Sequence, residues 1–373
     1  MSPMLSRSVF RTAVWCASVW WLTACGGGAS SNDSMTLPME AQAGARALSV
    51  TSGGPTLSDA GVTSAMPGVS RLALAPQGQT VVALSAWPAE ASVIDLATHR
   101  TLRRLRLLPH SLPVGATFLS NGTHLVVVGR DSVAQVWNLA QGTLDFQLRG
   151  HAQPLRALAS HPQGSRLATV GDDSRLLVWD TTQGRLVSVW PSGSERVASL
   201  AYSADGRRLV LAGGSSQVRI LDAQDGRLIQ LLSTFGSEVT LAVLSPDGRW
   251  LAGVQPAGRV TLWSQDPQAS QKGQFLPTPA LQFLSPGVRA LAFSADSRSA
   301  ISGGDDGVLR WWDLASGRLL RTYSDGTSPI NVLTFAPQSD RTVMTGLQDH
   351  RIVFWDLITG EKEVTFHAAA PDR

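Results

Sequence analysis

Two pairs of adjacent aspartates are the residues of this sequence with the clearest capacity for chemistry. Asp172-Asp173 and Asp305-Asp306 have the composition of a general acid and general base pair. The seven histidines show no metal-ligand spacing and stand at positions 99, 110, 124, 151, 161, 350 and 367. Residues 26–28 and 303–304 are glycines without the following helix and lysine of a phosphate loop, and no nucleophile-elbow serine occurs. The role of the aspartates therefore depends on the elements that hold them.

Those elements recur with a period of 42 or 43 residues. Each copy ends a strand-like run with an aromatic or aliphatic residue, usually followed by Asp, at Ile94, Trp137, Trp179, Leu221, Trp263, Trp312 and Trp355. The successive intervals are 43, 42, 42, 42, 49 and 43 residues. Four strand-like runs in a period of this size predict an all-β, seven-bladed β-propeller with four antiparallel strands in each blade. Asp outnumbers Glu by 22 to 6, which favours turns over helices.

The repeats resemble those of the WD-repeat β-propeller family over about residues 68–367. The resemblance implies that a tetrad of His, Ser or Thr, Asp and Trp pins each blade through hydrogen bonds. Blade three matches it throughout, with His151, Thr169, Asp173 and Trp179. Partial matches are Asp131 and Trp137 in blade two, Ser302, Asp306 and Trp312 in blade six, and Thr345, Asp349 and Trp355 in blade seven.

Blades one, four and five depart from the tetrad pattern. They have Pro88, Ser215 and Ala257 where the Asp belongs, so we expect them to rely mainly on apolar packing. In the other blades the resemblance makes the second Asp of each pair a structural acceptor. We expect the first, Asp172 or Asp305, to be solvated at the rim, which argues against acid–base catalysis and against an enzyme.

The N-terminus has the features of a bacterial export signal. Arg7 and Arg11 precede an apolar run over residues 12–24, which is short for a membrane-spanning helix. The run ends in Leu22-Thr23-Ala24-Cys25-Gly26, which resembles the lipobox of bacterial lipoproteins and implies cleavage before Cys25 and acylation of that residue. An uncleaved anchor helix and an ordinary signal peptide are the alternatives. In Gram-negative lipoproteins an Asp directly after the acylated Cys favours retention in the inner membrane. This chain has Gly26 there, so the resemblance implies an outer-membrane protein that faces the periplasm.

Three regions follow from these features. Residues 1–24 are the predicted lipoprotein signal peptide, 25–66 the acylated cysteine with a flexible tether of about 35 Å, and 67–373 the propeller. For ring closure, residues 363–367 are expected to supply the last outer strand, with residues 46–50 competing for the same edge. Residues 264–279 account for the long interval and are expected to form a loop on the bottom face.

Charge gives little indication of a polymeric anionic partner. Without the signal peptide, 29 basic residues face 28 acidic ones, a net charge of +1, and no block of five like charges occurs. We therefore expect no nucleic-acid binding, and contact with the membrane through the N-terminal lipid only. Cofactor-binding residues of quinoprotein or haem propellers are not recognisable, so no cofactor and no metal are expected.

The expected function is a membrane-tethered scaffold that binds a protein or peptide through its top face. In this family the turn between the second and third strands opens there, and the residue before the tetrad Asp points outward. Those residues are Trp87, Arg130, Asp172, Gly214, Pro256, Asp305 and Gln348, and Trp190 is expected to extend the rim. Trp and Arg are enriched in interface hot spots, although an exposed Trp can simply cap a loop. The alternatives are a periplasmic enzyme or electron-transfer subunit with a cofactor in the central channel, and a cell-wall or carbohydrate binder.

Replacement of the lipobox cysteine tests the anchor. Because Cys25 is the only cysteine left once the signal peptide and Cys16 are removed, Cys25→Ala should leave the chain unprocessed or release it from the membrane fraction. Metabolic labelling with palmitate and membrane fractionation measure this. Palmitate label that persists in the variant contradicts the lipoprotein interpretation.

Overall fold

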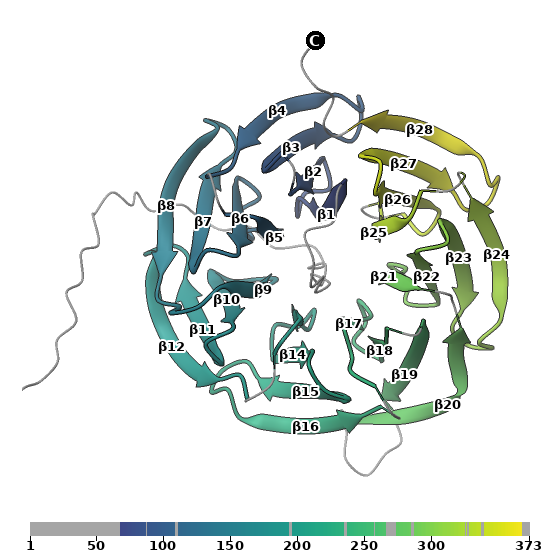
Figure 1. Ribbon diagram of the computed structural model, residues 1–373. Coiled ribbons are helices and arrows are strands. Elements are labelled where there is room, and N and C mark those ends of the chain that lie inside the picture. The colour runs from purple at the N-terminus through teal and green to yellow at the C-terminus, as the bar shows by residue number, and fades with distance from the viewer. Residues whose placement is uncertain are drawn as a thin grey trace, which may run out of the picture. The chain divides into compact units, whose positions relative to one another are not determined.

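The computed structural model describes residues 68–367, apart from 87, 109–110, 194–195, 235–236, 257, 266–273, 285–286, 325, 327 and 337–338. These described residues form 28 strands in seven four-stranded antiparallel sheets, without a helix. The sheets stand around a ring as blades, each with its strands in chain order from the axis outward (Figure 1). The predicted seven-bladed β-propeller is confirmed.

The strands fall into four concentric sets. The inner strands are β1 (Val69–Leu74), β5 (Pro113–Phe118), β9 (Leu155–Ser160), β13 (Ser199–Tyr202), β17 (Leu241–Leu244), β21 (Val288–Phe293) and β25 (Ile330–Phe335). The second strands are β2 (Thr80–Ser85), β6 (His124–Gly129), β10 (Arg166–Gly171), β14 (Arg208–Ala212), β18 (Trp250–Val254), β22 (Ser299–Gly304) and β26 (Thr342–Leu347). The third strands are β3 (Glu90–Asp95), β7 (Val133–Asn138), β11 (Arg175–Asp180), β15 (Gln217–Asp222), β19 (Arg259–Gln265), β23 (Val308–Asp313) and β27 (Arg351–Asp356). The outer strands are β4 (Thr101–Arg106), β8 (Thr143–Arg149), β12 (Arg185–Pro191), β16 (Leu228–Ser233), β20 (Phe275–Leu284), β24 (Leu319–Ser324) and β28 (Lys362–His367).

Short polar turns close the hairpins between inner and second strands. In blade four, the Ser203 hydroxyl donates to the Asp205 carboxylate over 2.5 Å, and the Gly206 amide donates to the Ser203 carbonyl over 2.8 Å. Gly206 has φ 70°, which a residue with a Cβ adopts only with strain. The Ser-x-Asp-Gly pattern of the sequence therefore fixes where this hairpin turns.

The core lies in the seams between successive blades. Each of seven apolar clusters joins one blade to the next, and together they go once around the ring. Alternate side chains of a strand point to opposite faces of its sheet, so one strand serves two seams. In β10, Leu167 packs towards blade two, whereas Ala168 and Val170 pack towards blade four.

The ring closes without exchange of a strand between its ends. β28 pairs with β27 and supplies the outer strand of blade seven from the C-terminal side, as the sequence predicted; residues 46–50 lie outside the described part of the chain. Among the described side chains, which do not include those of residues 363–367, the cluster between blades seven and one has eight buried apolar residues, against ten to thirteen in the other six. It is supplemented by a hydrogen bond from the Asn331 amide to the Val69 carbonyl, 3.2 Å, and by a ring contact between His99 and Phe354.

The predicted loop over residues 264–279 is in part a longer hairpin. Ser264 and Gln265 continue β19, and Gln265 pairs with Phe275 at the start of β20; residues 266–273 lie outside the described part. Phe275 is 2 % exposed, and its backbone exchanges two hydrogen bonds with the Gln230 side chain of β16. A buried aromatic and paired backbone groups thus hold the insertion to blade four, which its prolines had obscured in the sequence.

The tetrad of blade three forms a continuous line of hydrogen bonds. The Trp179 indole N–H lies 2.8 Å from the Thr169 hydroxyl, which lies 2.9 Å from His151 Nε2. His151 Nδ1 lies 3.0 Å from each Asp173 oxygen. A neutral imidazole with its hydrogen on Nδ1 satisfies every group, because the hydroxyl then receives from the indole and donates to Nε2.

Acid disturbs this line. Burial lowers the pKa of His151, despite the opposing effect of the Asp173 carboxylate. Burial opposes ionisation of Asp173 too, but hydrogen bonds from His151 and the Ala152 amide prevail and hold its pKa below the usual range. For both groups the unfolded chain binds protons more readily, so stability is lost as pH falls below about 6.5 for the histidine and below about 4 for the aspartate.

Substitutions in blades three and four separate the tetrad from simple packing. Trp179→Ala should lower the free energy of unfolding by about 3–5 kcal/mol, because it leaves a cavity and removes the donor to Thr169. Leu221→Ala, in a blade without a tetrad, should lose packing alone, about 2–3 kcal/mol. Trp179→Phe, which keeps most of the ring, should still cost about 1–2 kcal/mol. Urea unfolding measures all three, and equal losses for Trp179→Ala and Leu221→Ala contradict the tetrad.

Candidate functional site

The top face consists of the turns between second and third strands and the connections from each outer strand to the next inner strand. At this face, five inner strands skip one residue in their pairing with the second strand, which is a β-bulge. The skipped residues are Ser70, Val114, Arg156, Arg289 and Asn331. A bulge redirects the side chain of the unpaired residue. The described pairing of β13 and β17 has no such shift.

In blade three the redirected residue forms an ion pair with the first aspartate of the Asp-Asp pair. Arg156 Nε donates to Asp172 Oδ1 over 2.8 Å, and its Nη2 contacts Asp172 Oδ2, so the pair is bidentate. Arg196, from the connection into blade four, reaches Asp172 Oδ1 over 3.3 Å. The side chains of Arg156, Asp172 and Arg196 are 13, 25 and 52 % exposed. Two guanidinium groups around one carboxylate leave this cluster with a net charge of +1.

Blade six repeats the arrangement at the same positions. Arg289, at the bulge of β21, pairs with Asp305 in the turn after β22. Arg289 Nη1 also donates to Asn331 Oδ1 of blade seven over 2.7 Å, and Asn331 in turn donates to the Val69 carbonyl of blade one. A polar chain therefore crosses the top of two seams, including the seam that no connecting segment spans.

The two blades between these ion pairs have small or uncharged residues at the matching positions. Blade four has Ala198 and Gly214, and blade five has Thr240 and Pro256. Gly214 and Pro256 are exposed. The matching positions of blades four and five thus have no charged residue between one Arg–Asp pair and the next, although Glu238 is exposed in the connection between these two blades.

The structure places the predicted top-face residues in different surroundings. Arg130 is exposed in the turn after β6, and Gln348 is half-buried in the turn after β26. Asp172 and Asp305 are on the top face, and each forms an ion pair that the sequence did not predict. The Asp305 side chain is 55 % exposed, in keeping with the expected solvated position, whereas that of Asp172 is 25 % exposed. Trp87 lies outside the described residues.

Trp190 is apart from this group. It is half-buried in β12, and a Cβ on Gly226 of blade four would lie 2.3 Å from its ring. It therefore packs against the neighbouring turn and against the apolar cluster between blades three and four. Its part in the binding rim stays a prediction.

The sequence analysis missed the three arginines that meet these aspartates, Arg156, Arg196 and Arg289. Two of them left a signal in the repeat. Leu155-Arg156-Ala157-Leu158-Ala159 and Val288-Arg289-Ala290-Leu291-Ala292 match at four of five positions, and both precede an Asp-Asp pair. Arg196 lies in an irregular connection, where no repeat register defines its partner.

A second missed feature anchors the turns of blades two and six, which lack the tetrad histidine. Gln135, fully buried in β7, accepts from the Trp137 indole over 3.3 Å and donates to Asp131 Oδ2 over 3.4 Å. Arg310 occupies the same position in β23 and donates to Asp306 Oδ2 over 2.6 Å. Burial raises the pKa of the Asp131 carboxyl. The signal was a polar residue two places before the repeat tryptophan.

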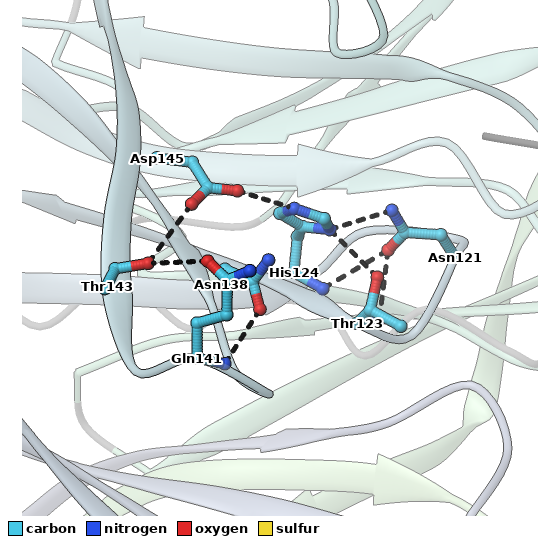
Figure 2. A network of polar contacts seen from close by, with 7 residues as sticks. All are labelled: Asn121, Thr123, His124, Asn138, Gln141, Thr143 and Asp145. Atoms are coloured by element: carbon cyan, nitrogen blue, oxygen red, sulfur yellow. Dashed lines mark hydrogen bonds and ion pairs between the residues drawn. The ribbon is translucent and has the colours of Figure 1, made fainter. Parts of the chain in front are cut away.

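Figure 2 shows a hydroxyl, an imidazole and a carboxylate together on the bottom side of blade two. His124 Nε2 lies 2.9 Å from Asp145 Oδ2, and its Nδ1 lies 2.9 Å from the Thr123 hydroxyl and 3.0 Å from the Asn121 amide. With a hydrogen on Nε2, the single lone pair of Nδ1 already receives a hydrogen from one of these neighbours. We therefore assign this network to holding the β5–β6 turn against β8.

The described residues include neither a metal-binding cluster nor a membrane-spanning helix. Within the described parts of 68–367, no group of three or more His, Cys, Asp or Glu side chains could hold a metal ion. The same residues include no helix long and apolar enough to cross a membrane.

Comparison with known proteins relates this geometry to a family. Residues 142–180 and 281–313 match the family described as WD domain, G-beta repeat; these stretches include the Arg–Asp strands of blades three and six. Methylosome protein WDR77 of Xenopus laevis is 32 % identical over 69 residues, which are 18 % of this chain and 21 % of the relative. Small ribosomal subunit protein RACK1z of Arabidopsis thaliana is 39 % identical over 70 residues, 19 % of this chain and 20 % of the relative. The chain matches only about a fifth of each relative's length, and these likenesses support a WD-repeat β-propeller.

Double-mutant cycles test whether Arg156 interacts more strongly with Asp172 than Arg196 does. The cycle of Arg156→Ala with Asp172→Ala should give a coupling energy of about 1–2 kcal/mol, because the pair is bidentate and mostly buried. The cycle of Arg196→Ala with Asp172→Ala should give at most about 0.5 kcal/mol, because Arg196 is half exposed and water screens it. Urea unfolding provides the energies, and a larger coupling for Arg196 contradicts the assignment.

Proposed function

We propose that this protein is a lipid-anchored, non-enzymatic scaffold that binds a protein or peptide through the top face of its propeller. The observation that carries the proposal is the Arg–Asp pair repeated in blades three and six. WD-repeat propellers generally mediate protein–protein interaction, and the matched stretches support a WD-repeat propeller for this chain. The two relatives are named as a methylosome protein and a small ribosomal subunit protein, hence as parts of larger assemblies.

Arg196 is the group on this face best suited to a partner's carboxylate. Its side chain is 52 % exposed, and its contact with Asp172 is a single one of 3.3 Å. Asp172 stays neutralised by Arg156 when Arg196 turns away, so the exchange leaves no uncompensated charge. Arginine is among the residues most enriched in interface hot spots, and Arg130 on the adjacent blade adds a second exposed cation.

The neighbouring blades favour close approach of a peptide backbone. Gly214 lacks a side chain, and Ala198 and Thr240 are small, so an extended chain can cross blades four and five near the protein backbone. The Arg–Asp pair of blade six then offers a second polar contact on the far side. A peptide with an acidic group near one end and neutral residues following it fits this order.

We propose the location from the N-terminal sequence. The lipobox-like segment at Cys25 and the Gly after it favour an acylated protein on the outer membrane, facing the periplasm. The tether over residues 26–66 then leaves the propeller free to meet soluble or membrane-bound partners. This lipid is the membrane contact that the sequence predicts.

Of the two alternatives, carbohydrate binding depends on tryptophans that are accessible for stacking. Among the described residues every tryptophan is buried or half-buried. That leaves the top-face cations as the better-supported contacts.

Crosslinking in the producing cells tests the binding face. Trp87→Ala with Arg130→Ala, and separately Arg196→Glu, should each reduce the amount of crosslinked partner about tenfold or more, while the melting temperature stays nearly unchanged. Deletion of residues 266–273, which the sequence predicts to belong to a loop on the bottom face, is the matched control and should leave capture intact. Capture that survives both top-face changes but fails in the deletion would move the site to the bottom face.

A further inference from the structure

The outer strand of blade one is the most basic edge of the ring. Arg100, in the turn before β4, and Arg103, Arg104 and Arg106 in the strand fall within seven residues, and all four are exposed. Leu102, between them, is 58 % exposed, the highest value among the exposed large apolar residues of the described chain. An exposed apolar side chain among arginines has the composition of a surface that meets an anionic interface.

The pairing of β4 shows which of these side chains are available. Leu105 is buried in the seam with blade two, and Arg103, on the same side, donates to the carbonyls of Ala140 and Gln141 in that blade. Arg104 and Arg106 alternate with these two, so they lie on the opposite face of the sheet, and both are exposed. Arg104 Nε lies 3.5 Å from a Glu90 carboxylate oxygen. We call Arg100, Leu102, Arg104 and Arg106 the basic strip.

No other outer strand resembles it. The sequences of the seven outer strands contain seven Lys and Arg residues, of which three are in β4, whereas β16 and β20 contain none. The chain after the signal peptide has 29 basic and 28 acidic residues, a net charge of +1. Long-range attraction to an anionic surface is therefore weak, and a local concentration of arginines determines which edge of the ring approaches such a surface.

We propose that the basic strip docks the propeller onto an anionic phospholipid bilayer. The planar guanidinium group binds phosphate oxygens in a bidentate manner, and Leu102 is placed to enter the headgroup layer between the arginines. Each arginine near such a surface strengthens binding about fivefold, within roughly one Debye length. The strip thus adds a weak, reversible contact to the predicted N-terminal lipid.

The position of the strip in the chain favours the bilayer over a soluble partner. This step rests on the anchoring part of the proposed function. The chain enters the ring at β1, and three strand spacings of about 4.8 Å place β4 roughly 14 Å away in the same sheet. The predicted tether spans about 35 Å, so the blade nearest the anchor can bring β4 to the membrane. One lipid with one basic contact makes the pair of signals that stable membrane attachment needs.

Docking through β4 also sets the orientation of the ring. Figure 1 shows the outer strands running along the circumference, whereas the top-face turns lie between the strands at the ends of the blades. A ring that rests on β4 stands on its edge, so that both faces remain open to the aqueous side. Membrane docking and partner binding therefore use different surfaces and can be tested separately.

Vesicle binding tests the proposal on residues 45–373. This portion is a compact unit that contains all 28 strands and all seven seam clusters, so it includes everything that holds the ring together, and it lacks Cys25. Vesicles of equal parts phosphatidylglycerol and phosphatidylcholine should bind it at low salt, and pure phosphatidylcholine vesicles should not. Arg104→Glu with Arg106→Glu should weaken the partition coefficient about 30-fold or more, at about fivefold per arginine. Leu102→Ser should weaken it less.

Arg185→Glu with Arg227→Glu is the matched control, because it changes the net charge equally at exposed positions of blades three and four. Circular dichroism and melting temperature establish that each variant is folded. Equal losses in the strip variant and the control, or binding to pure phosphatidylcholine, would overturn the proposal. So would unchanged vesicle binding in a folded strip variant, or a strip variant that loses the crosslinked partner instead. Loss of capture in Arg196→Glu with normal vesicle binding concerns the top face alone.

Discussion

Burial of apolar side chains between successive blades is the interaction on which the rest of this structure depends. A single four-stranded blade exposes both faces of its middle strands, so it gains a core only when neighbours cover both sides. Leu167 and Ala168, adjacent in β10, serve opposite seams, and this alternation makes every blade a component of two cores. The ring must therefore be closed, because a missing blade would leave two apolar faces open to water.

The repeat made the ring predictable, because strand alternation, turn residues and the period all reflect local rules. The tetrad of blade three was predictable for the same reason, since its four positions recur at fixed offsets. What the sequence could not provide was the partner of each charged side chain. The sequence predicts Asp172 to be a solvated rim residue. Its ion pair depends on a bulge that turns Arg156 towards it, and this bulge is a feature of the pairing between β9 and β10. For Trp190, the sequence could not provide the contact between its ring and Gly226 of the neighbouring blade. Arg196 lies in a connection with no repeat register at all.

The Asp-Asp pairs join structure to surface chemistry. Asp173 is fixed by His151 and by the Ala152 amide, and Asp306 by Arg310. The turn that each second aspartate holds then presents the first aspartate to an arginine of the inner strand. Each of the two adjacent carboxylates has its own cation or hydrogen-bond donors. Where the second aspartate is absent, in blades four and five, no such ion pair occurs among the described residues, and the two matching positions are uncharged.

No connecting segment crosses the seam between blades seven and one, so the packing of the ring does not require that the chain begin at blade one. Every blade is built from one continuous stretch, and blades seven and one meet as any two neighbours do, through a cluster of apolar residues. The described connections between blades are three to seven residues long. A linker of that length from His367 to Gly68 would make the ring continuous, and the chain could then begin at any blade. In such circular permutants the tether would join a different blade. The blade at which the chain begins would then determine which edge of the ring lies next to the anchor.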